Sequence, residues 1–222
     1  MARRTKEEAL ATRHRLIDAA ELLFQAQGVS HTSLQQIAEK AGATRGAVYW
    51  HFKDKADIFN AMMERVTLPL ETAAHEAGSS EADPLGQIEQ VMAEALRLMI
   101  TDPQARRVFE VATHKVEYTS EMASVQQRHL SVRNECVADF EKAMRLAALR
   151  ARMKLAVPAK TASMGLHALI SGLIQDWLLD PGAFDLVQTG RSTVRAYLIG
   201  LGFARPAIVD EVVPTTARDE PR

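Results

Sequence analysis

Residues 44–55 carry the side chains whose types and spacing best suit one specific chemistry, the reading of duplex DNA. The segment reads Thr-Arg-Gly-Ala-Val-Tyr-Trp-His-Phe-Lys-Asp-Lys. Arg45 is the residue type that pairs bidentately with the O6 and N7 atoms of guanine. Tyr49 and His51 can donate to phosphates or touch thymine methyl groups, and Lys55 can anchor the DNA backbone across the groove. The pattern favours a helix that lies in the major groove.

Such a helix needs a partner helix and a turn, and the sequence predicts two short helices hinged at Gly42. Thr32 or Ser33 caps the first helix, with a glutamine placed to complete a capping box. Glycine adopts the positive φ that the turn requires at no steric cost. Thr44 caps the second helix and leaves its first N–H groups facing a phosphate, and Gly46 lets the backbone approach DNA closely.

The two adjacent aromatic residues, Tyr49 and Trp50, cannot both face the DNA, because neighbours on a helix point about 100° apart. We expect Tyr49 to face outward and Trp50 to lie at the edge, contacting both DNA and protein. A generic helical hairpin with a solvated cationic face is the alternative interpretation of the same spacing. The candidate DNA-binding residues are Thr32, Ser33, Thr44, Arg45, Gly46, Tyr49, Trp50, His51 and Lys55.

The composition is that of an ordinary globular protein. The chain has 222 residues, of which 47% are hydrophobic and 25% charged, enough for one large or two small domains. Cys136 is the only cysteine, so an internal disulfide is excluded and a reducing compartment is favoured. No apolar run approaches the roughly 20 residues of a membrane span, and the basic N-terminus lacks the apolar stretch of a secretory signal. We expect a cytoplasmic protein that does not contact the membrane.

The charge is distributed unevenly although the net charge is only −1. Residues 1–55 hold nine Lys and Arg against six Asp and Glu, whereas the remaining residues hold 18 against 22. A basic end on an acidic body is expected when one small module meets phosphate and the rest does not.

Nearly every segment repeats its apolar residues at helical spacing, and no alternating strand pattern is evident. The sequence predicts a first helix from a Thr5–Glu8 capping box to Gly28. A fourth helix opens at Asp54 and Asp57, and Pro69 is expected to kink or end it. The fold class is therefore all-α.

A polar, breaker-rich linker at residues 78–84 is the best candidate boundary within the larger part of the chain. About nine helices are expected in all. Those beyond the linker are a helix from about Ile88 to Asp102, a short one around Phe109, a long one from about Ser120 to Leu155, one from Pro158 to the stop at Asp180, and a last one that includes Val194 and Leu201.

The segment from Thr44 to Phe52, followed by Lys55 and an apolar helix, resembles the TetR family of bacterial transcriptional regulators. The similarity covers roughly residues 10–60, with Val48 where the family more often has isoleucine. The opening residues 3–9 and the Tyr-Trp-His-Phe variant resemble more particularly the AcrR-type and TtgR-type repressors of multidrug efflux operons. A weaker likeness continues through the rest of the chain.

The resemblance implies a two-part, all-α protein. A three-helix helix-turn-helix DNA-binding domain would span residues 1–53, and a larger helical domain for effector binding and dimerisation would span 54–204. Residues 205–222, rich in Pro, Thr and charge, would form a mobile tail.

Several helices of the larger part carry apolar faces interrupted by Met, Cys, Thr, Ser and His, where an optimised core would have Leu and Ile. Such stripes are usually plain core, and that alternative stays open. The resemblance implies instead a pocket for a small lipophilic or aromatic effector, although Phe109, Ser171 and Gln175 differ in polarity from the TtgR-like pattern. The candidate ligand-binding residues are Val66, Ile88, Val91, Met92, Phe109, Thr113, Cys136, Phe140, His167, Ile170, Ser171, Ile174 and Gln175.

A homodimer is expected from the last two helices, because small residues permit close approach of helices between chains. Packing within one chain is the alternative, and the resemblance favours the dimer. Two recognition helices about 34–36 Å apart, or a multiple, would read a near-palindromic operator. The candidate interface residues are Ala162, Gly165, Gly172, Val194, Leu198 and Leu201.

The predicted function is a dimeric transcriptional repressor that a small effector releases from its operator, controlling a multidrug efflux operon. A TetR-type regulator of lipid or small-metabolite genes is the alternative within the family. An enzyme is disfavoured because no HExxH, GxSxG, P-loop or GxGxxG motif is present, and a helical adaptor would not need the Thr44–Lys55 constellation. We expect no cofactor and no metal.

Overall fold

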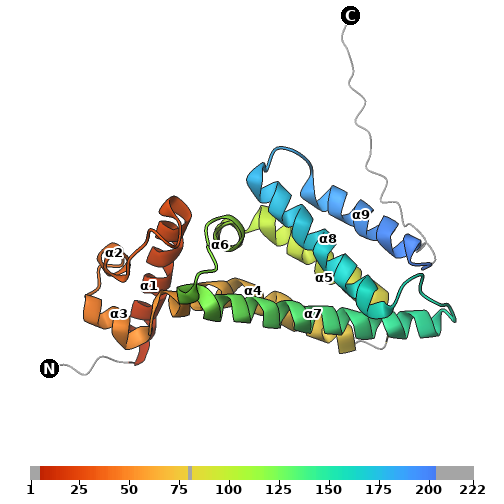
Figure 1. Ribbon diagram of the computed structural model, residues 1–222, viewed down its shortest axis with the longest axis horizontal. Helices are drawn as coiled ribbons and strands as arrows, with labels where there is room; N and C mark the ends of the chain where they lie inside the picture. Colours follow the sequence, from red (N-terminus) through yellow and green to blue (C-terminus); the bar gives the residue numbers. More distant parts are fainter. Residues whose placement is uncertain (1–5, 80–81, 204–222) are drawn as a thin grey trace, which may run out of the picture.

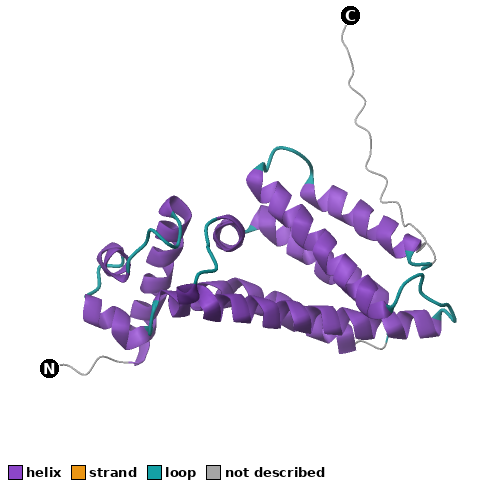
Figure 2. Ribbon diagram, viewed as in Figure 1, coloured by secondary structure: helices purple, strands orange, loops and turns teal. Residues whose placement is uncertain are grey.

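The computed structural model describes residues 6–79 and 82–203, and within them all regular structure is helical (Figure 2). The all-α prediction is thereby confirmed. The elements are α1 (Lys6–Gln27), α2 (Leu34–Lys40), α3 (Arg45–His51), α4 (Lys55–Ser79), α5 (Pro84–Thr101), α6 (Pro103–His114), the 3-10 turn η1 (Ser120–Met122), α7 (Ala123–Arg150), α8 (Ala159–Leu179) and α9 (Leu186–Gly200). The proposed cap at Thr5 and the tail 205–222 lie outside the described residues.

Helices α1 to α3 gather at one end of the molecule, and α4 runs out of this three-helix unit along α7 into the larger helical body (Figure 1). Helices α5, α8 and α9 complete the body, and α6 packs against α1. Leu16 of α1, Ile37 of α2 and Val48 of α3 are fully buried in the three-helix unit. Burial of such side chains from water holds the unit together.

The hairpin of α2 and α3 forms through the local chemistry that the sequence predicts. The Ser33 hydroxyl accepts from the backbone N–H of Gln36, whose side chain accepts in return from the Ser33 N–H, which completes a capping box. Gly42 has a φ of +63° in the turn. The Thr44 hydroxyl accepts from the N–H of Ala47 at 3.1 Å and so caps α3.

The structure excludes one of the two outcomes predicted for Pro69 and corrects one predicted helix boundary. Helix α4 begins after Asp54, whose carboxylate accepts from the Asp57 N–H at 2.8 Å, but Pro69 does not end it and lies inside the helix. Pro69 is exposed, and the packing of α4 along α7 compensates for the backbone hydrogen bond that a proline cannot make. Helix α7 is also shorter than predicted, because residues 120–122 form the separate turn η1 and the helix ends at Arg150.

The predicted dimer residues are largely used within the chain. Ala162, Val194, Leu198 and Leu201 are at most 5% exposed, and the Tyr197 hydroxyl donates to the Ala162 carbonyl at 2.9 Å across α8 and α9. A Cβ at Gly165 would meet that same hydroxyl. These five positions are used within the chain, where α9 packs on α5 and α8, so they offer little surface to a second chain. Gly172 alone of the predicted set faces open space.

Candidate DNA interface and its coupling to the helical body

The outer face of α3 presents a cationic and aromatic pair. Val48 is buried and fixes the helix on the three-helix unit, whereas Arg45 and Tyr49 face solvent. The Arg45 guanidinium lies 5.6 Å from the centre of the Tyr49 ring and donates to its hydroxyl at 3.3 Å. This hydrogen bond raises the pKa of Arg45 above its usual value. The guanidinium of Arg45, held beside the Tyr49 ring, can therefore donate charged hydrogen bonds to a base edge or to a phosphate.

Trp50 is more exposed than the sequence led us to expect. Its side chain is 72% exposed, against 51% for Tyr49, and its indole meets the His51 ring edge-on with centroids 4.5 Å apart. Trp50 therefore lies at the exposed edge of α3 and contacts protein through His51, whereas Phe52 at the end of the helix is buried. Tyr49 and Trp50 are both available to DNA.

Thr32 and Lys55, predicted to contact DNA, are buried side chains. Thr32 is 2% exposed; its hydroxyl donates to the Gly28 carbonyl at 2.8 Å and lies 3.2 Å from the Gln27 amide nitrogen. Its role is to join the end of α1 to α2, which corrects the prediction. Lys55 is 8% exposed, and its ammonium donates to the Thr32 carbonyl at 3.2 Å.

A surface hollow of about 480 Å³ lies beside this face. Lys55 lines it, and so do two residues that sequence reasoning missed, His31 and Lys53. Their only sequence signal was their position flanking the hairpin. The full lining is Ser30, His31, Thr32, Ser33, Leu34, Tyr49, Lys53, Asp54, Lys55 and Glu121.

The candidate ligand-binding residues do not line this hollow, nor a second one of about 580 Å³ at the end of α7. The candidate ligand-binding residues on α4 and α5 are part of the core. On α6, the Thr113 hydroxyl donates to the Phe109 carbonyl of the same helix at 2.7 Å. Buried are Val66, Ile88, Val91, Met92, Phe140, Ile170 and Ile174; partly buried are Phe109, Cys136 and His167; exposed are Thr113, Ser171 and Gln175.

The polar groups between α7 and α8 have shifted pKa values. Burial lowers the pKa of His167, and His129 and Arg133 lower it further. Burial also lowers the pKa of His129. Burial raises the pKa of the Cys136 thiol to about 12. Both imidazoles are thus biased to the neutral form and the thiol to its protonated form.

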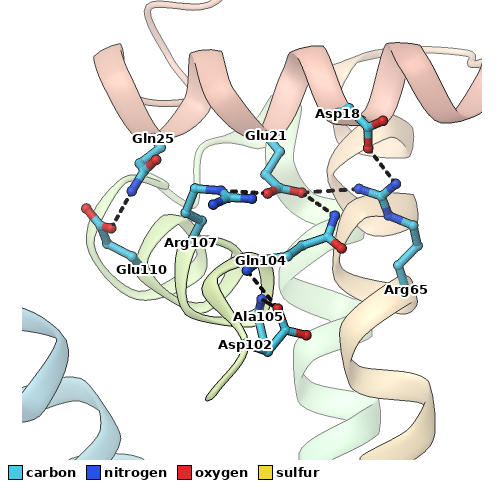
Figure 3. Close-up of polar contacts among 9 residues, drawn as sticks. All are labelled: Asp18, Glu21, Gln25, Arg65, Asp102, Gln104, Ala105, Arg107 and Glu110. Carbon is cyan, nitrogen blue, oxygen red and sulfur yellow. Dashed lines mark hydrogen bonds and ion pairs between the residues drawn. The ribbon is translucent and has the colours of Figure 1, made fainter. Parts of the chain in front are cut away.

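A buried carboxylate, Glu21, connects the three-helix unit to the body (Figure 3). Its side chain is 2% exposed and points from α1 toward α4 and α6. It accepts from Arg107 at 2.9 Å, from Gln104 at 3.0 Å and from Arg65 at 3.1 Å. Arg65 also donates to Asp18 at 2.7 Å. Sequence reasoning passed over Glu21, although a carboxylate within the apolar stripe of α1 was an available signal.

Further contacts tie the segment between α6 and α7 to the loop between α1 and α2. The Val29 N–H donates to the Lys115 carbonyl at 2.9 Å, and the Ser30 hydroxyl lies 3.4 Å from the Glu117 carboxylate. Hydrogen bonds therefore join the segment that follows α6 to the loop that precedes α2.

A small helical unit that projects a capped, exposed helix, set on a longer helical body, defines a helix-turn-helix DNA-binding protein. Residues 16–62 match the family of bacterial regulatory proteins called tetR, and residues 83–203 match the C-terminal region of the MAATS-type transcriptional repressors. The chain belongs to the TetR family of bacterial transcriptional regulators.

Individual relatives are similar to this chain over most of their length. The HTH-type transcriptional regulator TtgR of Pseudomonas putida is 38% identical over 191 residues, which cover 84% of this chain and 90% of TtgR. NalD of Pseudomonas aeruginosa, the secondary repressor of the MexAB-OprM multidrug efflux pump, has a TM-score of 0.80 at 37% identity, covering 88% of this chain and 98% of NalD.

A third relative was solved with a small molecule. SmeT, the repressor of the Stenotrophomonas maltophilia multidrug efflux pump SmeDEF, in its complex with triclosan has a TM-score of 0.78 at 28% identity, covering 92% of this chain and 99% of SmeT. The protein is thus a DNA-binding transcriptional repressor, rather than the enzyme or adaptor left open by the sequence. Within residues 6–79 and 82–203, no helix is long and apolar enough to cross a membrane.

Proposed function

We propose that this protein represses a multidrug efflux operon in the cytoplasm, as a homodimer that a small lipophilic or aromatic effector releases from a near-palindromic operator. The observation that carries the proposal is the exposed Arg45–Tyr49 pair on the capped helix α3. NalD and SmeT, which regulate efflux pumps, share its architecture across almost their whole length. The division into a DNA-binding domain over 1–53 and an effector domain over 54–204 belongs to this proposal.

The DNA-contacting surface in this proposal consists of α3 and the neighbouring hollow. In the DNA complex the Arg45 guanidinium exchanges its hydrogen bond to Tyr49 for hydrogen bonds to a base edge. Tyr49 and Trp50 contact the sugar–phosphate backbone and thymine methyl groups. The Lys55 ammonium reaches a phosphate through the hollow. The remaining contacts come from Ser33, Thr44, Gly46 and His51.

The dimer face in this proposal lies on the open side of α8 and α9, opposite the intrachain packing. Met164 is 39% exposed, Leu179 67% and Ile199 43%. A Cβ at Gly172 or at Gly200 would meet nothing within 4 Å. Large apolar side chains beside such openings suit a helix-on-helix interface with a second copy.

The effector site in this proposal lies among α5, α6, α7 and α8, where Phe109 and Cys136 are only partly buried against the core. SmeT binds triclosan, an aromatic molecule. An effector can weaken operator binding only through different affinity for the two conformations, and such coupling is typically about 1–3 kcal/mol. The Glu21 contacts between α1, α4 and α6 provide the mechanical path.

The test is a DNA-binding titration with the intergenic DNA immediately upstream of the gene. Arg45→Ala and Tyr49→Ala should each lose operator binding while the unfolding temperature stays that of the wild type, because both side chains are exposed. Lys160→Ala, an exposed cation at the start of α8, is the matched control. Wild-type affinity in both α3 variants would overturn the assignment. A thermal-shift screen of antibiotics, flavonoids and acyl compounds then separates efflux control from the regulation of lipid genes.

A further inference from the structure

Glu121 is the only residue lining the hollow beside the DNA-reading face that lies beyond Lys55 in the chain. All the other lining residues lie between Ser30 and Lys55. Glu121 belongs to η1, the short turn between α6 and α7. Its carboxylate lies 3.6 Å from the Lys55 ammonium, and its side chain is 60% exposed against 10% for Lys55. The η1 turn therefore places one negative charge inside a site otherwise built by residues 30–55.

The ammonium of Lys55 has a fixed position and a restricted approach. Its stem is buried, and the Thr32 carbonyl accepts one of its protons at 3.2 Å. The other charged groups lining the hollow are Lys53 and Asp54, and the Asp54 carboxylate is engaged in capping α4. A phosphate that enters the hollow to reach Lys55 meets the Glu121 carboxylate at the same ammonium, and two anions at that distance repel each other.

We propose that Glu121 is an electrostatic gate that holds the ammonium of Lys55 in the DNA-free protein and competes with operator phosphate for it. The inference rests on the proposed function, in which Lys55 contacts a phosphate. It goes further by assigning to a residue of the effector body a direct, negative contribution to DNA affinity.

The position of η1 couples this gate to the state of the body. Met122, next to Glu121, is 3% exposed and anchors the turn in the core, and the segment before it is bound to the three-helix unit through Val29 and Lys115. A shift of α6 or of the start of α7 therefore moves Glu121 toward or away from Lys55. A conformation that keeps the two charges together disfavours DNA, and one that parts them favours it.

The test compares Glu121→Gln with the wild type and with Glu135→Gln, which removes the same charge from an exposed position on α7. Binding is measured by fluorescence anisotropy with two labelled duplexes of equal length, the DNA upstream of the gene and an unrelated sequence. Because phosphate contacts are independent of sequence, Glu121→Gln should tighten both complexes, by about two- to fivefold for a largely exposed ion pair. The gain should shrink as salt is raised, and Glu135→Gln should give less than half of it.

The wild-type measurement separates failure of this inference from failure of the proposed function. A wild-type protein that binds neither duplex refutes the proposed function. A wild-type protein that binds, with Glu121→Gln equal to it or weaker, overturns the gate, because a merely structural role for Glu121 predicts loss.

A Lys55→Met background tests whether the effect passes through Lys55. There the addition of Glu121→Gln should change the affinity no more than Glu135→Gln does. A gain of the full size in that background also overturns the inference, because it would arise from net charge alone.

Discussion

Replacing Glu21 should destabilise the protein more than replacing any exposed carboxylate of α1. Glu21→Gln keeps the shape of the side chain but removes the charge that Arg65 and Arg107 share. Breaking a fully buried ion pair costs about 3–5 kcal/mol. Arg65 and Arg107 are 25% and 31% exposed, and Arg65 retains Asp18, so water and that carboxylate compensate in part. We expect a loss of about 1–2 kcal/mol for Glu21→Gln and about 2–3 kcal/mol for Glu21→Ala.

The measurement is the thermal unfolding temperature together with urea unfolding of the same variants. For a chain of this size 1 kcal/mol corresponds to roughly 2–4 °C, so Glu21→Ala should melt roughly 4–12 °C below the wild type. Asp18→Asn is the matched control, because it removes the exposed partner of the same arginine and should cost at most about 1 kcal/mol. If Glu21→Gln and Asp18→Asn proved equally stable, the reasoning from burial and shared charge would be refuted.

Three further predictions concern titration, reactivity and packing. The lowered pKa values of His129 and His167 mean that the unfolded chain binds more protons below about pH 6.5. Urea stability should therefore fall as the pH drops below this value, and a double His→Gln variant should fall less; an unchanged slope would contradict the assignment. Cys136, with a pKa raised to about 12, should react with a thiol reagent at pH 8 far more slowly in the native protein than in urea, and equal rates would contradict its burial. Gly78→Ala places a Cβ 2.7 Å from Asp139 of α7 and should cost about 1–3 kcal/mol in urea unfolding. Gly182→Ala, exposed and only 3.5 Å from the Asp180 carboxylate, should change the stability little, and equal stability of the two variants would show that the α4–α7 approach is not tight.

The sequence by itself determined the features that depend on groups close along the chain. The capping box at Ser33 and the Thr44 cap were predicted from residue types, because their hydrogen bonds join residues no more than four apart. The positive φ of Gly42 was predicted because it depends on the residue type at that one position. The all-α class followed from the helical period for the same reason. The family resemblance carried by α3 needed no tertiary information either.

Only the tertiary structure decided which groups meet across the fold. Glu21 binds Arg65, Gln104 and Arg107, at sequence separations of 44, 83 and 86 residues, and no local pattern encodes such partners. We expected the small face of α8 to meet a second chain, but the hydrogen bond from Tyr197 to Ala162 shows that α9 packs on this face. A helical period states that a face is apolar, but what covers that face depends on how the helices are arranged in space.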